Sequence, residues 1–589
     1  MPFSALNLPS IALTQLKAVA EEKFGSAVRV RILYLHHDFA LYFGKELYSY
    51  VIGALQANNS GLGDWIFRQV AFPEEADNTA YYFQRYFPRL DERETALKGA
   101  MIAKRVGLKR YFESVVAKYQ LDREDLVGMS SMFAQNVAVF AMARTIKDRN
   151  PRVVTVMGGA NCEAPMGVEL ARHVAAMDFV FSGPALLSFP ELVQAQLDGE
   201  PERCHQIKGV FSRQNLDSPH LAGRGAIGEE LPIEVPVELD YESFLSDLTR
   251  SFPDRSIEPS ITFETSRGCW WGERSHCTFC GLNGGSMAYR SIPPSQALEI
   301  FRQLFERYAD RCKIFESVDN IMPRPYIKEV FGQLEPRSDV TIFYEVKADL
   351  KDWEMEILGR AGVRHIQPGI ESLATSTLKL MGKGTTAFQN VVFLKNCLRY
   401  GILPSWNLLI GFPRETSEVY EGYLAAIPRL MHLPPPSGAF PIRFDRYSPY
   451  FTRAAEYGLD LVPYEFYNAI YPFGPESLAR MAYYFEDKNY DAEYLVQLVG
   501  WQGKLMAAVG EWKARYAGSD GKTKASLRLS SQAGRDVVLD TRSGELEVKE
   551  LSALVNEVFL PHESVARVRS EIVLETLKEP SGLPLPARR

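Results

Sequence analysis

The chain has 589 residues, with 66 Lys and Arg against 73 Asp and Glu, so its net charge near neutral pH is −7. Hydrophobic residues make up 46% and charged residues 24%, which is typical of a folded globular protein rather than a disordered or fibrous one. This balance offers no overall basic surface for nucleic acid. No apolar run approaches the roughly 20 residues of a membrane helix, and no signal-peptide pattern opens the chain, so we expect a cytoplasmic protein without a membrane partner.

The first third of the chain alternates predicted strands with predicted helices. The expected strands cover 126–133, 153–163 and 178–183, and the expected helices cover 136–151 and 167–177. Each strand ends in Gly or Ser just before a helix, which is where an open parallel sheet binds its ligands. The pattern predicts a Rossmann-like α/β domain over residues 1–225.

A second αβ series follows a stretch at 226–258 that is rich in Pro, Gly and charge and is predicted to be a linker. Its six expected strands cover 261–268, 313–320, 340–348, 363–373, 402–413 and 441–450. Six strands suit a partial or full barrel over 259–455. Residues 456–589 are predicted to form a helical, winged-helix-like α+β region, with a hairpin at 525–542 and helices at 551–560 and 562–577.

Three of the seven cysteines, Cys269, Cys277 and Cys280, follow the first strand of the second series with the spacing C-x7-C-x2-C. A structural zinc site needs four ligands, and His276 is an awkward fourth because it is adjacent to Cys277. A redox C-x-x-C pair leaves Cys269 unexplained. Three thiolates suit a cubane iron–sulfur cluster that keeps one iron open. Phe279, between the last two cysteines, is either an aromatic face for an adenine or a core residue.

The cysteine motif resembles that of the radical S-adenosylmethionine (SAM) superfamily. The segments "RGCWWGERSHCTFCGLNGG", "FYEVKADL", "QPGIESLATSTLKLMGKGTT", "NLLIGFPRET" and "IRFDRYSPYF" together resemble the cobalamin-dependent subgroup that matures ribosomally synthesised peptides. Segments of the first domain such as "SSMFAQNVAVFAMARTIKDRNP" and "VMGGANCEAPMG" resemble it as well. The resemblance covers most of residues 1–485.

The resemblance implies a [4Fe-4S] cluster on Cys269, Cys277 and Cys280, with SAM bound to its open iron. It also implies that polar residues at the ends of the barrel strands contact SAM, although each of them taken alone is as readily explained by an ion pair or a strand cap. These candidates, together with the aromatic one, are Phe279, Asp319, Glu345, Lys347, Gln367, Glu371 and Asn407.

The resemblance further implies that the first domain binds cobalamin, where plain Rossmann turns are the alternative. The candidate contacts are Ser130, Ser131, Met132, Gln135, Gly158, Gly159, Ser182 and Gly183. The motif D-x-H-x-x-G, whose His ligates cobalt, is absent, and His36 and His37 are expected to end a strand without it, so His ligation is not expected. Two departures from the family are the missing apolar strand before "MPFSALNLPSIAL" and Pro184 at a position usually held by Glu.

The implied reaction is methyl transfer to an unactivated sp3 carbon of a precursor peptide, through a substrate radical and methylcobalamin, with electrons from a flavodoxin or ferredoxin type donor. Tyr447 and Tyr450 are candidates to line the cavity, and packing is their other explanation. The C-terminal region either docks a leader peptide or caps the barrel. Three alternatives stay open: non-methylating radical chemistry with the same cofactors, a small-molecule substrate, and a metal or corrin carrier without enzymatic activity.

Overall fold

The computed structural model of the protein describes residues 2–284, 287–519, 521, 523–532, 535–543 and 545–550. The chain forms two compact units. Unit 1 consists of Met1–Gly268, Gly281–Val318 and Arg443–Lys488, and unit 2 consists of Cys269–Cys280, Asp319–Ile442 and Asn489–Arg589. Within the described residues, no helix combines the length and the apolar character that crossing a membrane requires.

Unit 1 begins with a helical region that packs aromatic side chains. Its helices are α1 (Ile11–Phe24), α2 (Leu35–Phe43), α3 (Lys45–Gly53), α4 (Leu55–Asn59), α5 (Leu62–Trp65), α6 (Arg68–Ala71), α7 (Thr79–Tyr86), α8 (Glu92–Val106) and α9 (Leu108–Tyr119). Trp65 stacks on Tyr82 with ring centroids 4.0 Å apart. Helix α1 begins after Ser10, whose hydroxyl accepts the Leu13 N–H at 3.3 Å, as expected of an N-cap.

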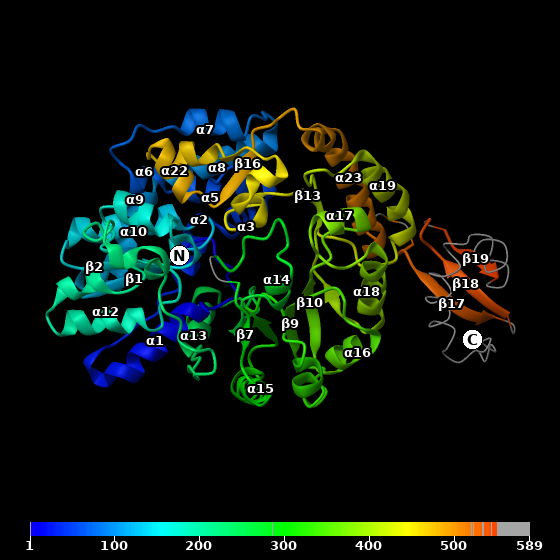
Figure 1. The fold of residues 1–589 in the computed structure, drawn as a ribbon, viewed down its shortest axis with the longest axis horizontal. Helices are drawn as coiled ribbons and strands as arrows, with labels where there is room; N and C mark the ends of the chain where they lie inside the picture. Colours follow the sequence, from blue (N-terminus) through cyan, green and yellow to red (C-terminus); the bar gives the residue numbers. More distant parts are fainter. Residues whose placement is uncertain are drawn as a thin grey trace. The chain divides into compact units, whose positions relative to one another are not determined.

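A four-stranded sheet follows these helices, in the order β1-β2-β3-β4. Its strands are β1 (Leu126–Ser130), β2 (Val154–Gly158), β3 (Phe179–Phe181) and β4 (Val210–Phe211), and its helices are α10 (Asn136–Arg149), α11 (Met166–His173) and α12 (Ser188–Leu197). β1, β2 and β3 are parallel, and β4 is antiparallel to β3. Figure 1 shows α10 and α12 on opposite sides of β1 and β2. Parallel pairing places the ends of β1 and β2 at one edge, with Ser130 opposite Gly158.

The remainder of unit 1 contains two further groups of elements. The first consists of α13 (Glu242–Ser251), the parallel pair β5 (Ser260–Phe263) and β8 (Ile314–Ser317), the antiparallel pair β6 (Ser266–Arg267) and β7 (Arg290–Ser291), and α15 (Pro294–Tyr308). The second is the antiparallel sheet β14 (Phe444–Asp445), β16 (Tyr484–Asp487) and β15 (Leu461–Pro463), with α20 (Pro449–Thr452), α21 (Phe466–Ile470) and α22 (Pro475–Met481).

Unit 2 contains the parallel strands β9 (Thr341–Val346), β10 (Val363–Pro368) and β11 (Leu403–Pro404), and the parallel pair β12 (Leu408–Ile410) and β13 (Ala439–Pro441). Its helices are α14 (Trp270–Arg274), α16 (Asp352–Arg360), α17 (Thr375–Leu380), α18 (Ala387–Arg399), α19 (Ser417–Leu430) and α23 (Glu493–Ala517), and a π-helical turn spans Ile327–Phe331. Val363 and Ile366 of β10 are fully buried, which places the core beneath the strands that carry the polar candidates.

The C-terminal hairpin is present as β17 (Leu527–Gln532) and β18 (Arg535–Asp540), and β19 (Glu547–Glu550) adds a third antiparallel strand. Arg515 of α23 is 1% exposed and donates to the carbonyls of Thr523 and Thr541, both at 2.7 Å, which ties the hairpin to the helix. The helices expected at 551–560 and 562–577 lie outside the described residues. The expected domain boundaries stay predictions.

The α/β fold with two series of parallel strands is confirmed, and some local expectations differ from the structure. His36 and His37 do not end a strand, because both lie in α2, where His37 is held between Asp247 (Nδ1 to Oδ2, 2.7 Å) and the Leu6 carbonyl (2.9 Å). The expected strand at 402–413 is divided into β11 and β12, and residues from the one at 441–450 fall in β13 and β14. The stretch 226–258 contains α13, whose Phe244 and Leu248 are buried.

Candidate functional site

The three cysteines lie in one loop of unit 2, and all three are half-buried. Cys269 caps α14, since its sulfur accepts the Gly272 N–H at 3.3 Å. The Cys280 N–H bonds to the Cys277 carbonyl at 3.1 Å, and His276 Nε2 contacts the Cys280 carbonyl at 2.8 Å. The imidazole of His276 is therefore used to hold the backbone of the loop.

Three successive carbonyls at and just after the end of α17 hold the cysteine loop in place, and a fourth holds Lys347. The carbonyls of Leu380 and Met381 accept from the Thr278 hydroxyl (3.1 Å) and the Thr278 N–H (3.0 Å). The Gly382 carbonyl accepts the indole N–H of Trp271 at 3.2 Å, and the Lys383 carbonyl accepts Lys347 Nζ at 2.5 Å. Leu380 is the last residue of α17, so its carbonyl has no partner within the helix, and the Thr278 hydroxyl satisfies it.

Trp271 is enclosed on two sides. Lys347 Nζ lies 3.8 Å from the centroid of its ring system, close enough for a cation–π interaction. Gly384 has φ +67°, and a Cβ built on it would lie 2.3 Å from Cη2 of Trp271. Only glycine fits there, because a side chain would meet both a strained backbone and the indole.

Lys383 provides a positive charge beside the cysteines. Its Nζ lies 3.3 Å from Oε1 of Glu371, and its side chain is 12% exposed. Burial lowers the pKa of Lys383, but Glu371, Cys277 and Cys280 outweigh burial and raise it overall. Lys383 therefore remains an ammonium ion next to two of the thiols.

Two further charged candidates of β9 and the following turn lie in the same electrostatic environment. Burial raises the pKa of Glu345 to about 7, with a further contribution from Glu371 and a smaller one from Asp319. Burial also lowers the pKa of Lys347 to about 8. The structure thus brings together several of the expected SAM contacts, namely Asp319, Glu345, Lys347 and Glu371.

The other expected SAM contacts vary in their surroundings. Phe279 is half-buried, meets Phe412 edge-on with centroids 5.9 Å apart, and has Lys383 Nζ 5.8 Å from its ring. Gln367, in β10, and Asn407, just before β12, are exposed. An exposed amide remains available to a ligand, whereas the edge-on contact gives Phe279 a packing role.

The three thiols of this loop fit an iron–sulfur cube better than a single ion. Among the described residues, no three His, Cys, Asp or Glu side chains are arranged to hold one metal ion. A [4Fe-4S] cube places each cysteine on a different iron, so its thiolates need not converge on one point. Burial raises the pKa of Cys269, so that bound iron would be needed to keep this thiol ionised.

The expected cobalamin contacts lie at the carboxyl edge of the parallel sheet in unit 1, where one of them, Ser131, belongs to a network of neutral groups. The Ser131 hydroxyl donates to Oδ1 of Asn136 at 2.7 Å. Asn161 Nδ2 donates to the Ser131 hydroxyl at 3.0 Å and to Oδ1 of Asn136 at 3.1 Å. The network joins the loops that follow β1 and β2.

The expected glycines at this edge differ in whether a larger residue could replace them. Gly159 has φ +108°, and a Cβ there would lie 2.4 Å from the Ser131 carbonyl oxygen, whereas one on Gly158 would make only a 3.6 Å contact with Phe181. Gly183 has φ +81°. The Ser182 hydroxyl is not free, because it accepts the Ala164 N–H at 2.9 Å.

Two expected cobalamin contacts that follow β1 have different surroundings. Gln135 donates to the Pro2 carbonyl (3.0 Å) and to the Ser4 hydroxyl (2.8 Å), so it anchors the start of the chain. Met132 is 50% exposed, and its neighbour Phe133 is 62% exposed with φ +52°. This exposed apolar pair at the sheet edge suits a large flat ligand.

The two candidate tyrosines are in unit 1, and they differ. Tyr447 donates its hydroxyl to the Ala164 carbonyl at 3.0 Å, in the loop after β2. Tyr450 is 1% exposed and packs edge-on against Phe444 and Tyr457. The structure therefore places Tyr447 near the sheet edge and gives Tyr450 the surroundings of a core residue.

Several residues of these sites were not predicted from the sequence. Lys383 lies in the segment "LMGKGTT", whose Lys between two glycines was its only signal. Trp271 had no signal beyond its position two residues after Cys269. Asn136 and Asn161 resemble ordinary residues of a helix start and a turn, so the sequence offered nothing to single them out.

Comparisons with known proteins agree with the cysteine motif. Residues 263–425 match the model of the radical SAM superfamily. The chain is 24% identical over 305 residues to "Uncharacterized methyltransferase PH0819" of Pyrococcus horikoshii, which is 50% of this chain and 62% of the relative. It is 29% identical over 177 residues to 4'-phospho-dehydrooxetanocin synthase of Priestia megaterium, which is 26% of this chain and 23% of the relative. The match thus spans less than two thirds of either relative.

A solved structure is also similar. It is that of the cobalamin-dependent S-adenosylmethionine radical enzyme OxsB with aqua-cobalamin bound, with a TM-score of 0.48 and 16% sequence identity over 64% of this chain and 57% of that one. The family model covers the three cysteines and the strands of unit 2 that carry the charged candidates. Residues 263–425 of this chain therefore form a radical SAM domain.

Proposed function

We propose that this protein is a cobalamin-dependent radical SAM methyltransferase that methylates an unactivated sp3 carbon of a ribosomally synthesised peptide. The observation that carries the proposal is the cysteine loop of unit 2, where three half-buried thiols lie in the same electrostatic environment as Lys383 and Glu371. A cluster with one open iron is the group that this donor set fits.

In the proposal, a [4Fe-4S] cluster bound by the cysteines supplies the electron that cleaves SAM, and cobalamin carries the methyl group. The chain's own residues bind and orient these groups. The ammonium groups of Lys347 and Lys383 offer donors to the SAM carboxylate, and Glu345 and Glu371 offer acceptors to its amino group and ribose hydroxyls. The half-buried loop keeps these polar contacts away from bulk water, which strengthens them.

Cobalamin is assigned to the carboxyl edge of the first sheet. Supporting observations are the exposed Met132 and Phe133, the close approach of the backbones at Gly159 and Ser131, and the sequence resemblance of this region to the cobalamin-dependent subgroup. Neutral hydrogen-bonding groups and small residues suit a large corrin, which is recognised by shape and by backbone approach.

The peptide substrate and the electron donor, of the flavodoxin or ferredoxin type, rest on the sequence resemblance. The segments "ESVDNIMP", "NLLIGFPRET" and "IRFDRYSPYF" are the parts of the barrel that carry the resemblance to the peptide-maturing enzymes. A relative named as a methyltransferase supports the reaction type.

The test is anaerobic turnover of the full-length protein, reconstituted with cluster and hydroxocobalamin, with SAM, reductant and candidate precursor peptide. We expect 5'-deoxyadenosine, S-adenosylhomocysteine and a peptide that is heavier by one CH2. SAM cleavage that alters the peptide without adding mass would contradict methylation. If the protein with both cofactors bound does not cleave SAM, only the role of a metal or corrin carrier would remain.

A second candidate uses the same cofactors for cyclisation, rearrangement or oxidation of a peptide or a small molecule. The specific observation that favours it is the relative named as a synthase. Its sequence identity to this chain is higher than that of the other relative, although the matching segment is shorter. The mass of the product separates the two candidates, because this chemistry adds no methyl group.

A further inference from the structure

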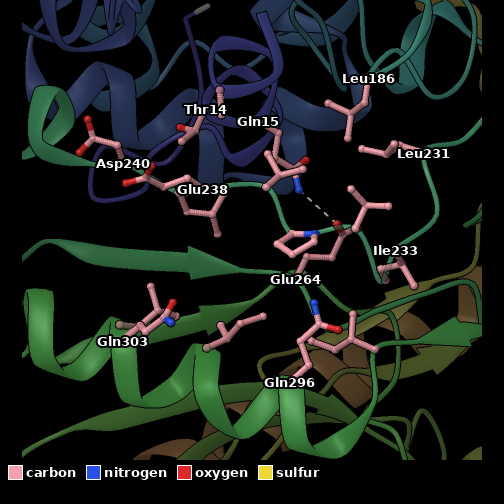
Figure 2. Close-up of a pocket in the computed structure, with 18 of the residues that line it drawn as sticks. Thr14, Gln15, Leu186, Leu231, Ile233, Glu238, Asp240, Glu264, Gln296 and Gln303 are labelled. Atoms are coloured by element: carbon pink, nitrogen blue, oxygen red, sulfur yellow. Dashed lines mark hydrogen bonds between the residues drawn. The ribbon is translucent and has the colours of Figure 1, made fainter. Parts of the chain in front are cut away.

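A cleft of about 820 Å³ lies entirely within unit 1 and contains none of the cysteines. Its walls are α1, the segment 231–240 and α15, and Figure 2 shows side chains from all three. None of the residues assigned above to SAM or cobalamin lines it. The cleft is therefore a separate candidate site that the proposed reaction does not use.

The two ends of the cleft differ in chemistry. Figure 2 shows Leu186, Leu231 and Ile233 at one end and Glu238 and Asp240 at the other. A smaller adjoining cavity of about 250 Å³ extends the apolar end with further Leu, Val and Pro side chains, and Glu22, Lys23 and Glu191 also line it. A ligand that fits both ends must have an apolar part and a polar part.

The charges of the cleft favour a cationic ligand. Its lining has six acidic residues, Glu21, Glu22, Glu238, Asp240, Glu264 and Glu299, and three basic ones, Lys17, Arg267 and Arg307. Arg267 is paired with Glu264 at 2.7 Å, and Arg307 with Glu238 (3.1 Å) and Asp240 (2.8 Å). The arginines are thus already neutralised, whereas Glu299 has no cationic partner in the part of the chain that the structure describes.

Three glutamines add hydrogen-bond acceptors along the cleft. Gln15 donates its amide to Glu264 Oε2 (3.3 Å), Gln296 to the Glu234 carbonyl (3.1 Å), and Gln303 to Glu299 Oε1 (2.9 Å). Each amide nitrogen is therefore bonded to the protein, and among the described residues nothing donates to the three amide oxygens. A ligand rich in N–H groups, such as a peptide backbone, suits such a lining.

The length of the lining fits several residues of extended chain. The α15 side chains that line the cleft run from Gln296 to Tyr308, and the helix rises about 18 Å over that distance. An extended peptide covers this length with about five residues. A simple polyamine would match the charge but would leave the apolar end empty.

We propose that this cleft binds an extended peptide segment that carries basic side chains next to apolar ones. The inference deepens the proposed function, on which it rests for its biological meaning, by assigning a surface that holds the substrate peptide outside the cofactor sites. The groups that recognise the peptide are Glu299 and the other acidic side chains of the cleft, the amide oxygens of the three glutamines, and the apolar wall around Ile233.

The test measures the fluorescence anisotropy of the labelled heptapeptide Lys-Lys-Gly-Leu-Pro-Val-Leu with the full-length, reconstituted protein, without SAM or reductant. We expect Glu299→Lys to weaken binding by roughly threefold to tenfold, because it reverses an unpaired charge of the lining. Glu306→Lys is the matched control, since Glu306 is exposed on the same helix and does not line the cleft. A peptide with Glu in place of both Lys should have a higher affinity for E299K than for the unchanged protein.

Equal effects of E299K and E306K, no binding of the Lys peptide, or displacement of that peptide by spermidine at equal affinity would overturn the proposal. A separate turnover assay on a precursor peptide distinguishes the two proposals. Binding without methyl transfer would contradict the proposed function and leave the cleft assigned. Methyl transfer by E299K with an unchanged KM for the precursor peptide would contradict peptide binding in the cleft and would leave the proposed function intact.

Discussion

The cysteine loop of unit 2 and the sheet edge of unit 1 are built from opposite kinds of side chains. Around the cysteines the groups are charged and half-buried, with Lys383 paired to Glu371 and Lys347 against Trp271. At the sheet edge they are neutral, with Ser131, Asn136 and Asn161 bonded to one another. The site proposed for SAM and the cluster therefore depends on particular charged side chains, whereas the edge proposed for cobalamin depends on small residues and the course of the backbone.

The largest expected effect is the loss of the cluster without any loss of cobalamin binding. Cys277→Ala should remove the cluster, about four irons per chain, and abolish SAM cleavage, because two thiols cannot hold a cube. Cobalamin binding, measured by absorbance, should persist. Cys312→Ala, at a buried cysteine of unit 1, is the control and should keep its iron. Loss of both cofactors in C277A would show that the two regions are not independent.

The sheet edge is tested through its backbone. Gly159→Ala should weaken cobalamin binding roughly tenfold or more, because its Cβ meets the Ser131 carbonyl and its φ is positive. Gly158→Ala is the control, since its Cβ makes only an ordinary contact. Equal cobalamin affinities in both variants would contradict the assignment of this edge.

The charge beside the cysteines should affect the cluster potential. Lys383→Met removes a buried ammonium ion next to Cys277 and Cys280, so the reduced, more negative cluster loses stabilisation. We expect the midpoint potential, measured by redox titration with electron paramagnetic resonance, to fall by roughly tens of millivolts. Lys379→Met, at an exposed Lys of α17, should leave it unchanged. An unchanged potential in K383M would contradict the role of this charge.

The packing of Trp271 gives a smaller effect on stability. Gly384→Ala and Gly401→Ala both place Ala at a positive φ, +67° and +65°, but only Gly384 faces the indole, since Gly401 is in open space. Both should destabilise by about 1 kcal/mol through strain, and G384A should lose roughly 1–2 kcal/mol more. Thermal unfolding measures the difference in stability. Equal losses of stability in the two variants would show that the indole of Trp271 can move aside without destabilising the protein.

The smallest effect concerns a buried acid linked to the sheet edge. Asp64 accepts from the Val137 N–H (3.0 Å) and the Tyr471 hydroxyl (2.9 Å), and burial raises its pKa to about 7. The folded state keeps a proton that the unfolded state releases near pH 4, so stability falls as the pH rises from about 4 to 7.

Asp64→Asn removes this titration. The variant should gain stability relative to the unchanged protein, by about 1 kcal/mol or more, as the pH rises from 5 to 8. Urea unfolding at several pH values measures the gain, with Asp148→Asn, at an exposed position of α10, as the control. A gain that does not depend on pH would contradict the elevated pKa of Asp64.

Sequence reasoning was most informative where periodicity and side-chain chemistry coincide. The β1, β2 and β3 runs are short and apolar, and each is followed by Gly or Ser, so their order was predictable. It was less informative for His36 and His37, because a short apolar run before them fits a strand and a buried helix equally well. α13 was missed for a related reason, since a Pro-rich context hid the spacing of Phe244 and Leu248.

The spacing of Cys269, Cys277 and Cys280 and the alternation of strands and helices could be recognised in the sequence alone, because side-chain chemistry and periodicity are local properties of the chain. The tertiary structure was needed to show that carbonyls 380–382 hold the cysteine loop, that the charge of Lys383 acts on two of its thiols, and that Gln135 binds the Pro2 carbonyl. The contacts of the cysteine loop and of Gln135 join residues 102 to 133 positions apart, and no local pattern records which distant segments fold against each other.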